Sequence, residues 1–342
     1  MKRKICIIIS VLLLLCTAGC SSSGESSPAD IVTGGKEQAG SVANGDLAAD
    51  SVIITVGNTD VTYREYQMYS YLLQSKYDTV LDSKIWDYRV QEDQTLGTEA
   101  VREIVRMIIQ LKIIEKEAIK QNISLTVDEK EEITFNIGKF LVQVPETDKN
   151  KYHITEEMFQ TVLENNVLAR MMFDVVTGSV NTDITPEQER VSRVQMIYFM
   201  SNGTNKENKE IKLDAAGKTA LFDKANRVRA RALKGSNFYT LAEKNTSISG
   251  IDFDMGPEDE PGEVTKTALA MKAGTISEVI STDDGFYLLR CISNNDKAAV
   301  EAHREELILS RQTKAFQDKY KEWTENYEVR VSESILEREL YE

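Results

Sequence analysis

Hydrophobic residues between positions 51 and 190 recur mainly at helical spacing. The exception comes first: the apolar run 52–56, the turn residues 57–60 and the return at Val61 predict a short strand pair. Glutamate follows Thr62 and Thr126 by three residues, which is typical of a capping box at a helix start. Helices are predicted over 63–73 and 99–121, and from Thr126, Thr155 and Thr185.

The first of these helices carries an aromatic stripe. Tyr63, Tyr66, Tyr69 and Leu73 fall at helical spacing. Such a stripe usually packs into a core. We therefore interpret it as core, with a surface that grips another protein as the alternative.

From residue 191 onward the pattern becomes mixed. Strand-favouring residues fill 193–200, and two further strands are predicted over 276–281 and 286–292. Between them lie three predicted helices and an acidic loop: helices 221–234, 235–242 and 265–272, and loop 250–263. This order predicts a compact α+β unit. A long helix over 296–323 and a strand over 328–331 follow, and we expect this tail to pack back onto the first domain.

The N-terminus reads as an export signal. Lys2, Arg3 and Lys4 precede the apolar run 5–15, which is too short for a membrane span of roughly 20 residues. Ala18 and Gly19 stand before Cys20, as in a bacterial lipobox, although Thr17 replaces its usual leucine. We expect residues 1–19 to be a signal peptide and Cys20 to be lipidated. The alternative is a plain cleaved signal with a chance cysteine.

Composition and charge argue against a nucleic-acid partner, an internal disulfide and a metal site. The formal net charge of −14 disfavours contact with phosphate backbones, so we expect no nucleic-acid partner. Segment 20–50 is rich in Ser, Gly and Ala and is expected to be a flexible tether. Cys291 alone remains in the folded part, which excludes an internal disulfide and favours a buried, unreactive thiol. His153 and His303 lie far apart and are expected on solvated helix faces, so we expect no metal and no cofactor.

Three motifs within 191–295 resemble parvulin-type peptidyl-prolyl isomerases. They are Gly235-x-x-Phe238-x-x-Leu241-Ala242, the segment ALAMKAGTISEV at 268–279, and GFYLL at 285–289. The whole mature chain is also similar in layout to extracytoplasmic foldases of the SurA and PrsA type. That resemblance implies an α+β protein: a mainly helical SurA-N-like domain (51–190), an inserted parvulin-like domain (191–295) and a C-terminal helical segment (296–342).

The resemblance also marks the positions where the family's catalytic groups stand. Gln195 occupies the place of the histidine in the first strand, and Tyr287 that of the histidine in the last strand. The family's Cys or Asp falls near Ser247 or Ile248. The Met and Phe of its proline pocket fall near Glu260 and Val264. Every one of these family residues is replaced here.

The leading hypothesis is therefore a membrane-tethered chaperone or foldase that binds unfolded, newly secreted polypeptides. The candidate substrate contacts, each of which is alternatively a core residue, are Met196, Tyr198, Val264, Met271 and Tyr287. Glu260, at a proline-pocket position of the family, is a further candidate contact. One alternative is an active isomerase in which Gln195 and Tyr287 form the polar pair around the substrate carbonyl. Another is the substrate-binding lipoprotein of a transporter. Clients, oligomeric state, and the choice between cell membrane and outer membrane stay open.

Overall fold

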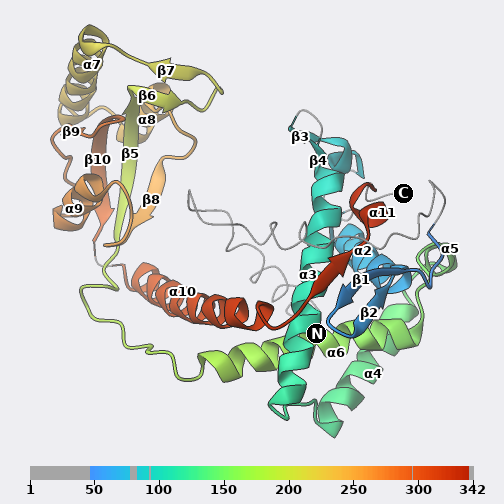
Figure 1. Ribbon diagram of the computed structural model, residues 1–342. Helices are drawn as coiled ribbons and strands as arrows, with labels where there is room; N and C mark the ends of the chain where they lie inside the picture. The colour runs from blue at the N-terminus through green and yellow to red at the C-terminus, as the bar shows by residue number, and fades with distance from the viewer. Residues whose placement is uncertain (1–46, 78–82, 92–93, 295, 339–342) are drawn as a thin grey trace. The chain divides into compact units, whose positions relative to one another are not determined.

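The computed structural model describes residues 47–77, 83–91, 94–294 and 296–338 (Figure 1). The predicted signal peptide, Cys20 and nearly all of the predicted tether lie outside these residues. The described chain forms two compact units. The helical unit combines the residues up to Val180 with those from Thr313 onward, and the sheet unit comprises Asn181–Gln312.

Among its described residues up to Val180, the helical unit contains five α-helices, and all of them except the one that follows Pro145 start directly after a threonine. Thr95 and Thr98 form a reciprocal capping box, as do Thr126 and Glu129, and Thr155 accepts a hydrogen bond from the N–H of Met158. The helices are α2 (Tyr63–Tyr77), α3 (Leu96–Lys120), α4 (Val127–Leu141), α5 (Glu146–Lys151) and α6 (Glu156–Thr177). Shorter elements are η3 (Ser83–Asp87), β3 (Arg89–Gln91) and β4 (Gln94–Thr95).

A small antiparallel sheet joins the two ends of the described chain. Its order is β11-β1-β2, so β1 (Val52–Val56) is central between β2 (Thr59–Thr62) and β11 (Val329–Val331). Helix α10 (Lys297–Thr324) starts in the sheet unit and ends in the helical unit, and α11 (Glu333–Leu336) follows β11. Phe316, Trp323 and Ile335 are buried in the same core as α3 and α6. The C-terminal segment thus completes the helical unit.

The aromatic stripe of α2 is core, as predicted. Tyr63, Tyr66 and Tyr69 are buried in the main apolar cluster of the helical unit. Thr62 accepts the N–H of Glu65 at 3.4 Å, but the carboxylate of Glu65 turns inward to Lys112 on α3. Only the threonine side of the predicted capping box is therefore formed, because the Glu65 carboxylate makes a buried ion pair instead of capping the helix.

The sheet unit contains a four-stranded antiparallel sheet in the order β8-β5-β10-β9. Its strands are β5 (Ser192–Met200), β8 (Asp252–Met255), β9 (Ile280–Ser281) and β10 (Gly285–Ser293). Three helices pack on it: α7 (Ala215–Leu233), α8 (Phe238–Asn245) and α9 (Gly262–Ala270). A hairpin of β6 (Asn202–Thr204) and β7 (Glu210–Lys212) follows β5. The predicted α+β class is confirmed.

Alternation along β5 and β10 divides the core of this unit between the two faces of the sheet. Ile197, Phe199 and Leu288 pack with α7 and α8, and we call this side the α7 face. Met196, Tyr198, Tyr287 and Leu289 pack with α9, and we call this side the α9 face. Cys291 is buried on the α9 face, as predicted for an unreactive thiol.

Two local predictions are wrong. Thr185 and Gln188 do exchange capping hydrogen bonds at 3.0 and 3.3 Å, but the chain makes only a turn there. A single turn fixes several residues for little hydrogen bonding, and β5 begins four residues later, so no helix propagates. The predicted acidic loop contains strand β8, because Phe253 and Met255 alternate with Asp252 and Asp254 along the edge of β5.

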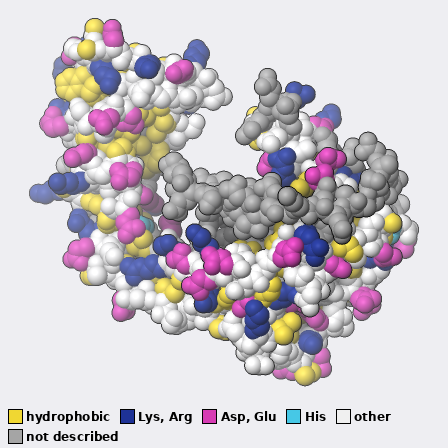
Figure 2. Space-filling model, viewed as in Figure 1, with side chains coloured by type: hydrophobic (Ala, Val, Ile, Leu, Met, Phe, Trp, Pro, Cys, Tyr) yellow, Lys and Arg dark blue, Asp and Glu magenta, His cyan; other side chains and the backbone are white. Residues whose placement is uncertain are grey.

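Lys and Arg side chains are interspersed with Asp and Glu over the visible face, without a continuous field of either sign (Figure 2). No helix in the described ranges has the length and apolar character needed to cross a bilayer.

Candidate functional site

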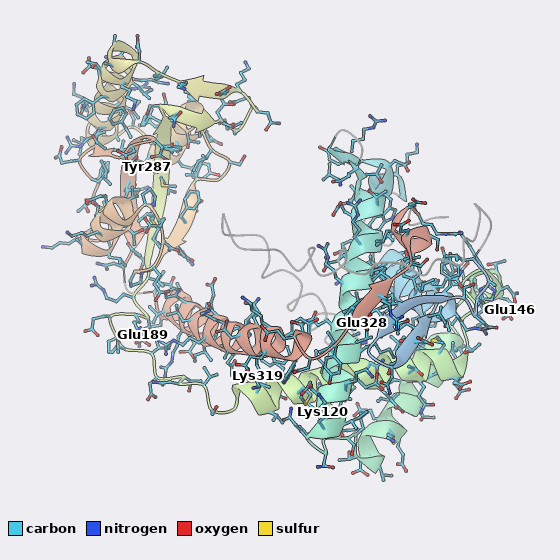
Figure 3. All side chains as sticks on the ribbon, in the orientation of Figure 1. Lys120, Glu146, Glu189, Tyr287, Lys319 and Glu328 are labelled. Atoms are coloured by element: carbon cyan, nitrogen blue, oxygen red, sulfur yellow. The ribbon has the colours of Figure 1, made fainter. Side chains whose placement is uncertain are left out.

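Two tyrosines from the central strands stand directly opposite each other on the α9 face. Tyr287 lies on β10 (Figure 3). It pairs in register with Tyr198 of β5. Their rings stack with centroids 4.4 Å apart and planes inclined by 19°. Both hydroxyls donate to the carboxylate of Asp284, at 2.8 Å from Tyr198 and 3.3 Å from Tyr287. The result is a buried aromatic pair anchored on one acid.

The electrostatics of this cluster keep both tyrosines protonated. Burial and the nearby charge of Asp284 raise the pKa of Tyr287 to about 12. Burial and the hydrogen bond to Asp284 raise the pKa of Tyr198 as well. For Asp284, burial favours the neutral acid, but hydrogen bonds from Thr282 and Tyr198 outweigh it and hold the pKa below its usual value. At neutral pH, two hydroxyl donors therefore face one carboxylate.

Gln195 does not join Tyr287, contrary to the predicted polar pair. It pairs in register with Arg290, whereas Tyr287 pairs with Tyr198. Positions 195 and 198 differ by an odd number, so strand alternation puts their side chains on opposite faces of the sheet. The β5 side chains that share the face of Tyr287 are Val194, Met196 and Tyr198.

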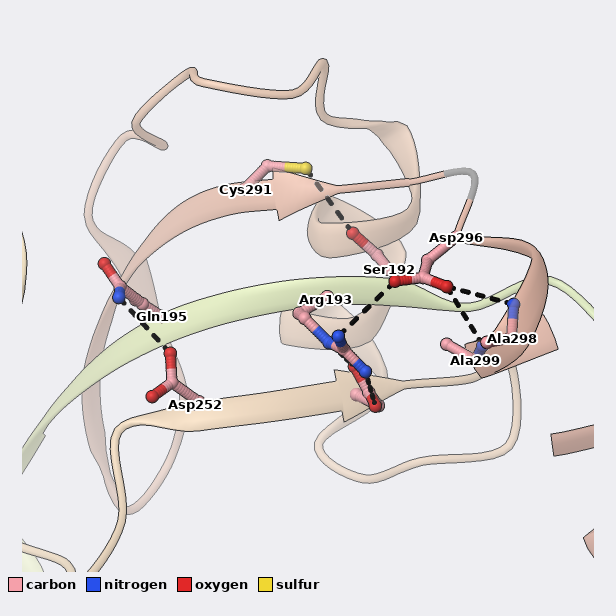
Figure 4. Close-up of polar contacts among 9 residues, drawn as sticks. Ser192, Arg193, Gln195, Asp252, Cys291, Asp296, Ala298 and Ala299 are labelled. Carbon is pink, nitrogen blue, oxygen red and sulfur yellow. Dashed lines mark hydrogen bonds and ion pairs between the residues drawn. The ribbon is translucent and has the colours of Figure 1, made fainter. Parts of the chain in front are cut away.

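The amide of Gln195 is occupied on its own face. Its Nε2 donates to Asp252 Oδ1 at 3.2 Å (Figure 4), and its Oε1 accepts from Arg290 Nη1 at 3.3 Å. Both partners come from strands that flank β5. The side chain thus links β8, β5 and β10.

A second polar cluster, which the sequence did not single out, lies beside Gln195. Arg193 binds Asp254 through two hydrogen bonds of 2.7 and 2.8 Å and also approaches Asp296 at 3.4 Å (Figure 4). Asp296 in turn accepts the N–H groups of Ala298 and Ala299 at the start of α10. Bidentate pairing with Arg193 lowers the pKa of Asp254. In the sequence, the alternation of Asp252 and Asp254 with apolar residues was the feature that could have indicated this cluster. The two acids lie on the edge strand β8, and Arg193 links Asp254 to Asp296 at the start of α10.

The two predicted proline-pocket positions are separated. Glu260 is exposed, and its carboxylate accepts the N–H of Gly262 at 2.7 Å, at the start of α9. Val264, four residues after Glu260, is fully buried on the α9 face. The charge of Glu260 therefore points to solvent rather than into an apolar pocket, where it would be costly to bury.

Ser247 and Ile248 lie at the edge of the tyrosine pair. Ser247 donates its N–H to the carbonyl of Tyr198 at 2.8 Å, and its hydroxyl accepts the N–H of Met200 at 3.2 Å. Ile248 is partly buried against the α9 face. Neither supplies a charge or a thiol near Tyr287.

The histidines differ from the predicted solvated helix positions. His153 is exposed but lies in a turn, with φ 52°, and its Nδ1 is 3.0 Å from Gln67 Oε1. His303 is on α10 but half-buried, with its ring directly against Gly256. Within the described ranges no three His, Cys, Asp or Glu side chains gather as metal ligands would.

One family model matches the chain over residues 206–293, and its description is a rotamase, the PPIC-type PPIase domain. The chain carries a PPIC-type peptidyl-prolyl isomerase domain. The match includes Tyr287 and begins after β5, so Gln195 lies outside it. No curated protein sequence matches the chain.

Several solved structures are similar to the chain at low identity. PrsA from Bacillus anthracis, a peptidylprolyl isomerase, is 14% identical over 64% of this chain and 96% of its own, with a TM-score of 0.36. A SurA-like chaperone from Campylobacter jejuni is 10% identical over 82% of this chain and 99% of its own, with a TM-score of 0.30. A single PpiC-type domain is 18% identical over 32% of this chain and 94% of its own, with a TM-score of 0.27.

The remaining candidate contacts belong to the interior of the sheet unit that carries the PPIC-type domain. Met196, Tyr198, Val264 and Met271 are all buried on the α9 face with Tyr287. The structure thus brings these five residues together and leaves Gln195 and Glu260 apart from them. In this structure their side chains are buried in one apolar cluster.

Proposed function

We propose that this protein is a lipid-anchored, extracytoplasmic folding factor that binds unfolded secreted polypeptides. The N-terminal pattern supports export and a lipid on Cys20, with segment 20–50 as a tether. The PPIC-type domain supports a role on polypeptide chains. Residues 51–190 and 296–342 form the helical part that holds clients, and 191–295 form the isomerase-like part.

The tyrosine pair carries the proposal that efficient isomerisation has been lost. Prolyl isomerases work by binding the twisted amide better than the planar one. That requires free hydrogen-bond donors and an apolar site for the proline ring. Here the hydroxyls of Tyr198 and Tyr287 already donate hydrogen bonds to Asp284, and Met196, Val264 and Met271 are buried in the same cluster as the two rings. The PPIC-type domain then retains its fold and serves to bind clients or to separate other parts of the protein.

One observation favours a second candidate, an isomerase with an unconventional site. Tyr287 stands where the family resemblance places a histidine, and its protonated hydroxyl is a hydrogen-bond donor across the working pH range. A substrate carbonyl that displaces Asp284 from Tyr287 would then be stabilised by that donor.

The transporter alternative has little support. A two-lobed substrate-binding protein is built on parallel α/β sheets. Every strand pair among the described residues is antiparallel.

The deciding experiment measures two properties of the mature protein side by side. Cis/trans exchange in a Phe-Pro peptide is followed by NMR, and aggregation of an unfolded client is followed by light scattering. We expect suppressed aggregation without catalysed exchange. Exchange that is catalysed by the wild type and lost in Tyr287→Phe, with Gln195→Ala as the control on the opposite face, would establish the isomerase instead. Absence of both properties would overturn the proposed function.

The anchor is tested separately. Cys20→Ser should move the protein from the membrane fraction to the soluble extracytoplasmic fraction, and metabolic labelling with a fatty acid should disappear. Retention at the membrane without labelling would contradict the lipid on Cys20.

A further inference from the structure

Helix α4 presents an apolar stripe on the side that faces away from its core contacts. Val127, Phe135 and the C-cap residue Val142 are 72%, 63% and 86% exposed. They are separated by eight and seven residues, which places them on one side of a helix. Ile133 and Ile137 lie on the opposite side and are buried against the helical unit. The outer side of the helix thus carries exposed apolar residues that are not covered within the unit.

Gly138 lies in the middle of this stripe. A Cβ at this position would have no neighbour within 4 Å, so no packing contact within the structure requires glycine. Glycine inside a helix costs about 1 kcal/mol relative to alanine. Its effect is a notch between Phe135 and Val142 where another chain can approach the helix backbone closely.

Acidic residues lie within and beside this stripe, because Glu131 is four residues from both Val127 and Phe135 on the same side of the helix. Asp128, Glu131 and Glu132 are exposed along α4, and no ion pair among the described residues engages them. Lys139 places its Nζ 3.9 Å from the centre of the Phe135 ring, so this ring already accepts a cation on its face. Exposed apolar surface beside uncompensated carboxylates is complementary to apolar segments that carry lysine or arginine.

We propose that the outer side of α4 binds client segments in which apolar residues are interspersed with Lys or Arg. The inference rests on the proposed function and adds to it the class of segment that is held. Apolar side chains of the client pack on Val127, Phe135 and Val142, its backbone approaches Gly138, and its cations lie against Asp128, Glu131 and Glu132. Clients rich in acidic residues are repelled from the same surface.

The test uses two fluorescent peptides of equal length and apolar content, one with lysines and one with glutamates, and the full mature chain. We expect the lysine peptide to bind about tenfold more tightly in fluorescence anisotropy. The triple variant Val127→Ser/Phe135→Ser/Val142→Ser should lose about tenfold of that affinity. Glu131→Lys/Glu132→Lys should reverse the preference between the peptides, a result that a purely structural role for α4 would not produce.

The matched control removes exposed apolar groups elsewhere. Tyr88 and Val90 lie before the start of α3, whereas α4 follows its end, and α3 is roughly 37 Å long (Figure 1). Tyr88→Ser/Val90→Ser should bind both peptides like the wild type. Thermal unfolding of all variants establishes that they are folded.

The outcomes separate this inference from the proposed function. A wild type that suppresses aggregation, with a triple variant that does so equally well, overturns the α4 site alone. A wild type that neither binds the peptides nor suppresses aggregation overturns the proposed function. A triple variant that converts a dimer to a monomer without a change in peptide affinity shows that a second copy occupies the stripe, and this also overturns the inference.

Discussion

The ammonium of Lys112 lies 3.0 Å from the carboxylate of Glu65, and both side chains are buried in the helical unit. Glu115 approaches the same ammonium at 3.5 Å from one turn away. The pair joins α2 to α3 in the interior of the helical unit. Two charges removed from water in this way stabilise a fold only as long as both are present.

Removal of one partner should therefore be costly. Glu65→Leu leaves the Lys112 charge in the core with only the longer contact to Glu115, and we expect a loss of about 3–5 kcal/mol in the free energy of unfolding. Glu65→Leu/Lys112→Met should recover much of that loss, because neither buried charge remains. Urea unfolding measures the free energy of unfolding of both variants. A double variant that is less stable than Glu65→Leu would contradict the expected recovery.

The hydroxyl of Tyr198 should contribute measurably to stability. Tyr198→Phe removes a hydrogen bond to a charged acceptor and leaves the ring stack intact, for an expected loss of about 1.5–3 kcal/mol. Tyr239→Phe, at an exposed position, should stay within about 0.5 kcal/mol of the wild type. Chemical denaturation measures both, and equal stabilities would show that the Asp284 contact is not formed in solution.

Asp284 should make the protein acid-sensitive. Its pKa is depressed in the folded state, so the stabilisation is present above the unfolded value near 3.8 and is lost as the pH falls through the folded pKa. Asp284→Asn should therefore show a smaller drop in Tm between pH 5 and acid pH than the wild type. Its exposed neighbour provides the control, since Asp283→Asn should keep the wild-type dependence. Identical profiles for wild type and Asp284→Asn would refute the assignment.

Two glycine-to-alanine changes should shift stability in opposite directions. A Cβ on Gly285 would lie 2.2 Å from the carbonyl oxygen of Phe199 and 2.8 Å from the ring of Tyr198, so Gly285→Ala should destabilise by about 1–3 kcal/mol or more. Gly138→Ala meets no neighbour and should stabilise α4 by about 0.5–1 kcal/mol. Differential scanning calorimetry shows whether each variant is more or less stable than the wild type. A stabilising Gly285→Ala would mean that β5 and β10 are further apart than described.

Much of the fold could be predicted from local patterns. The threonine caps before α4 and α6 and the strand-favouring residues of β5 are properties of short segments, and these elements form where expected. The helix expected at Thr185 fails for a non-local reason, because the chain must reach β5 within a few residues. Strand β8 was missed because its polar residues face solvent at a sheet edge and only Phe253 and Met255 mark its inner side.

The candidate site was harder to predict, because it depends on strand register. The family resemblance gave Gln195 and Tyr287 as equivalents of two facing histidines. The alternation of side chains within β5 does not determine which β5 residue pairs with Tyr287. A shift of the strand register by one residue moves every side chain of the strand to the other face of the sheet. In the structure, the β5 residue that pairs with Tyr287 is Tyr198. Asp284, the acid that binds both tyrosines, lies in a turn and carried no spacing signal of its own.

The helical unit is discontinuous in sequence, and this has a consequence for the order of folding. Strand β1 is among the first described segments to be synthesised, yet its partner β11 and the core residue Phe316 come more than 250 residues later. The intervening sheet unit holds all its strand pairs within Asn181–Gln312, so it can complete its own structure first. Strand β1 therefore cannot pair with β11 until nearly the whole described chain has been made, and a truncation between residues 312 and 329 should leave a folded sheet unit inserted in an incomplete helical unit.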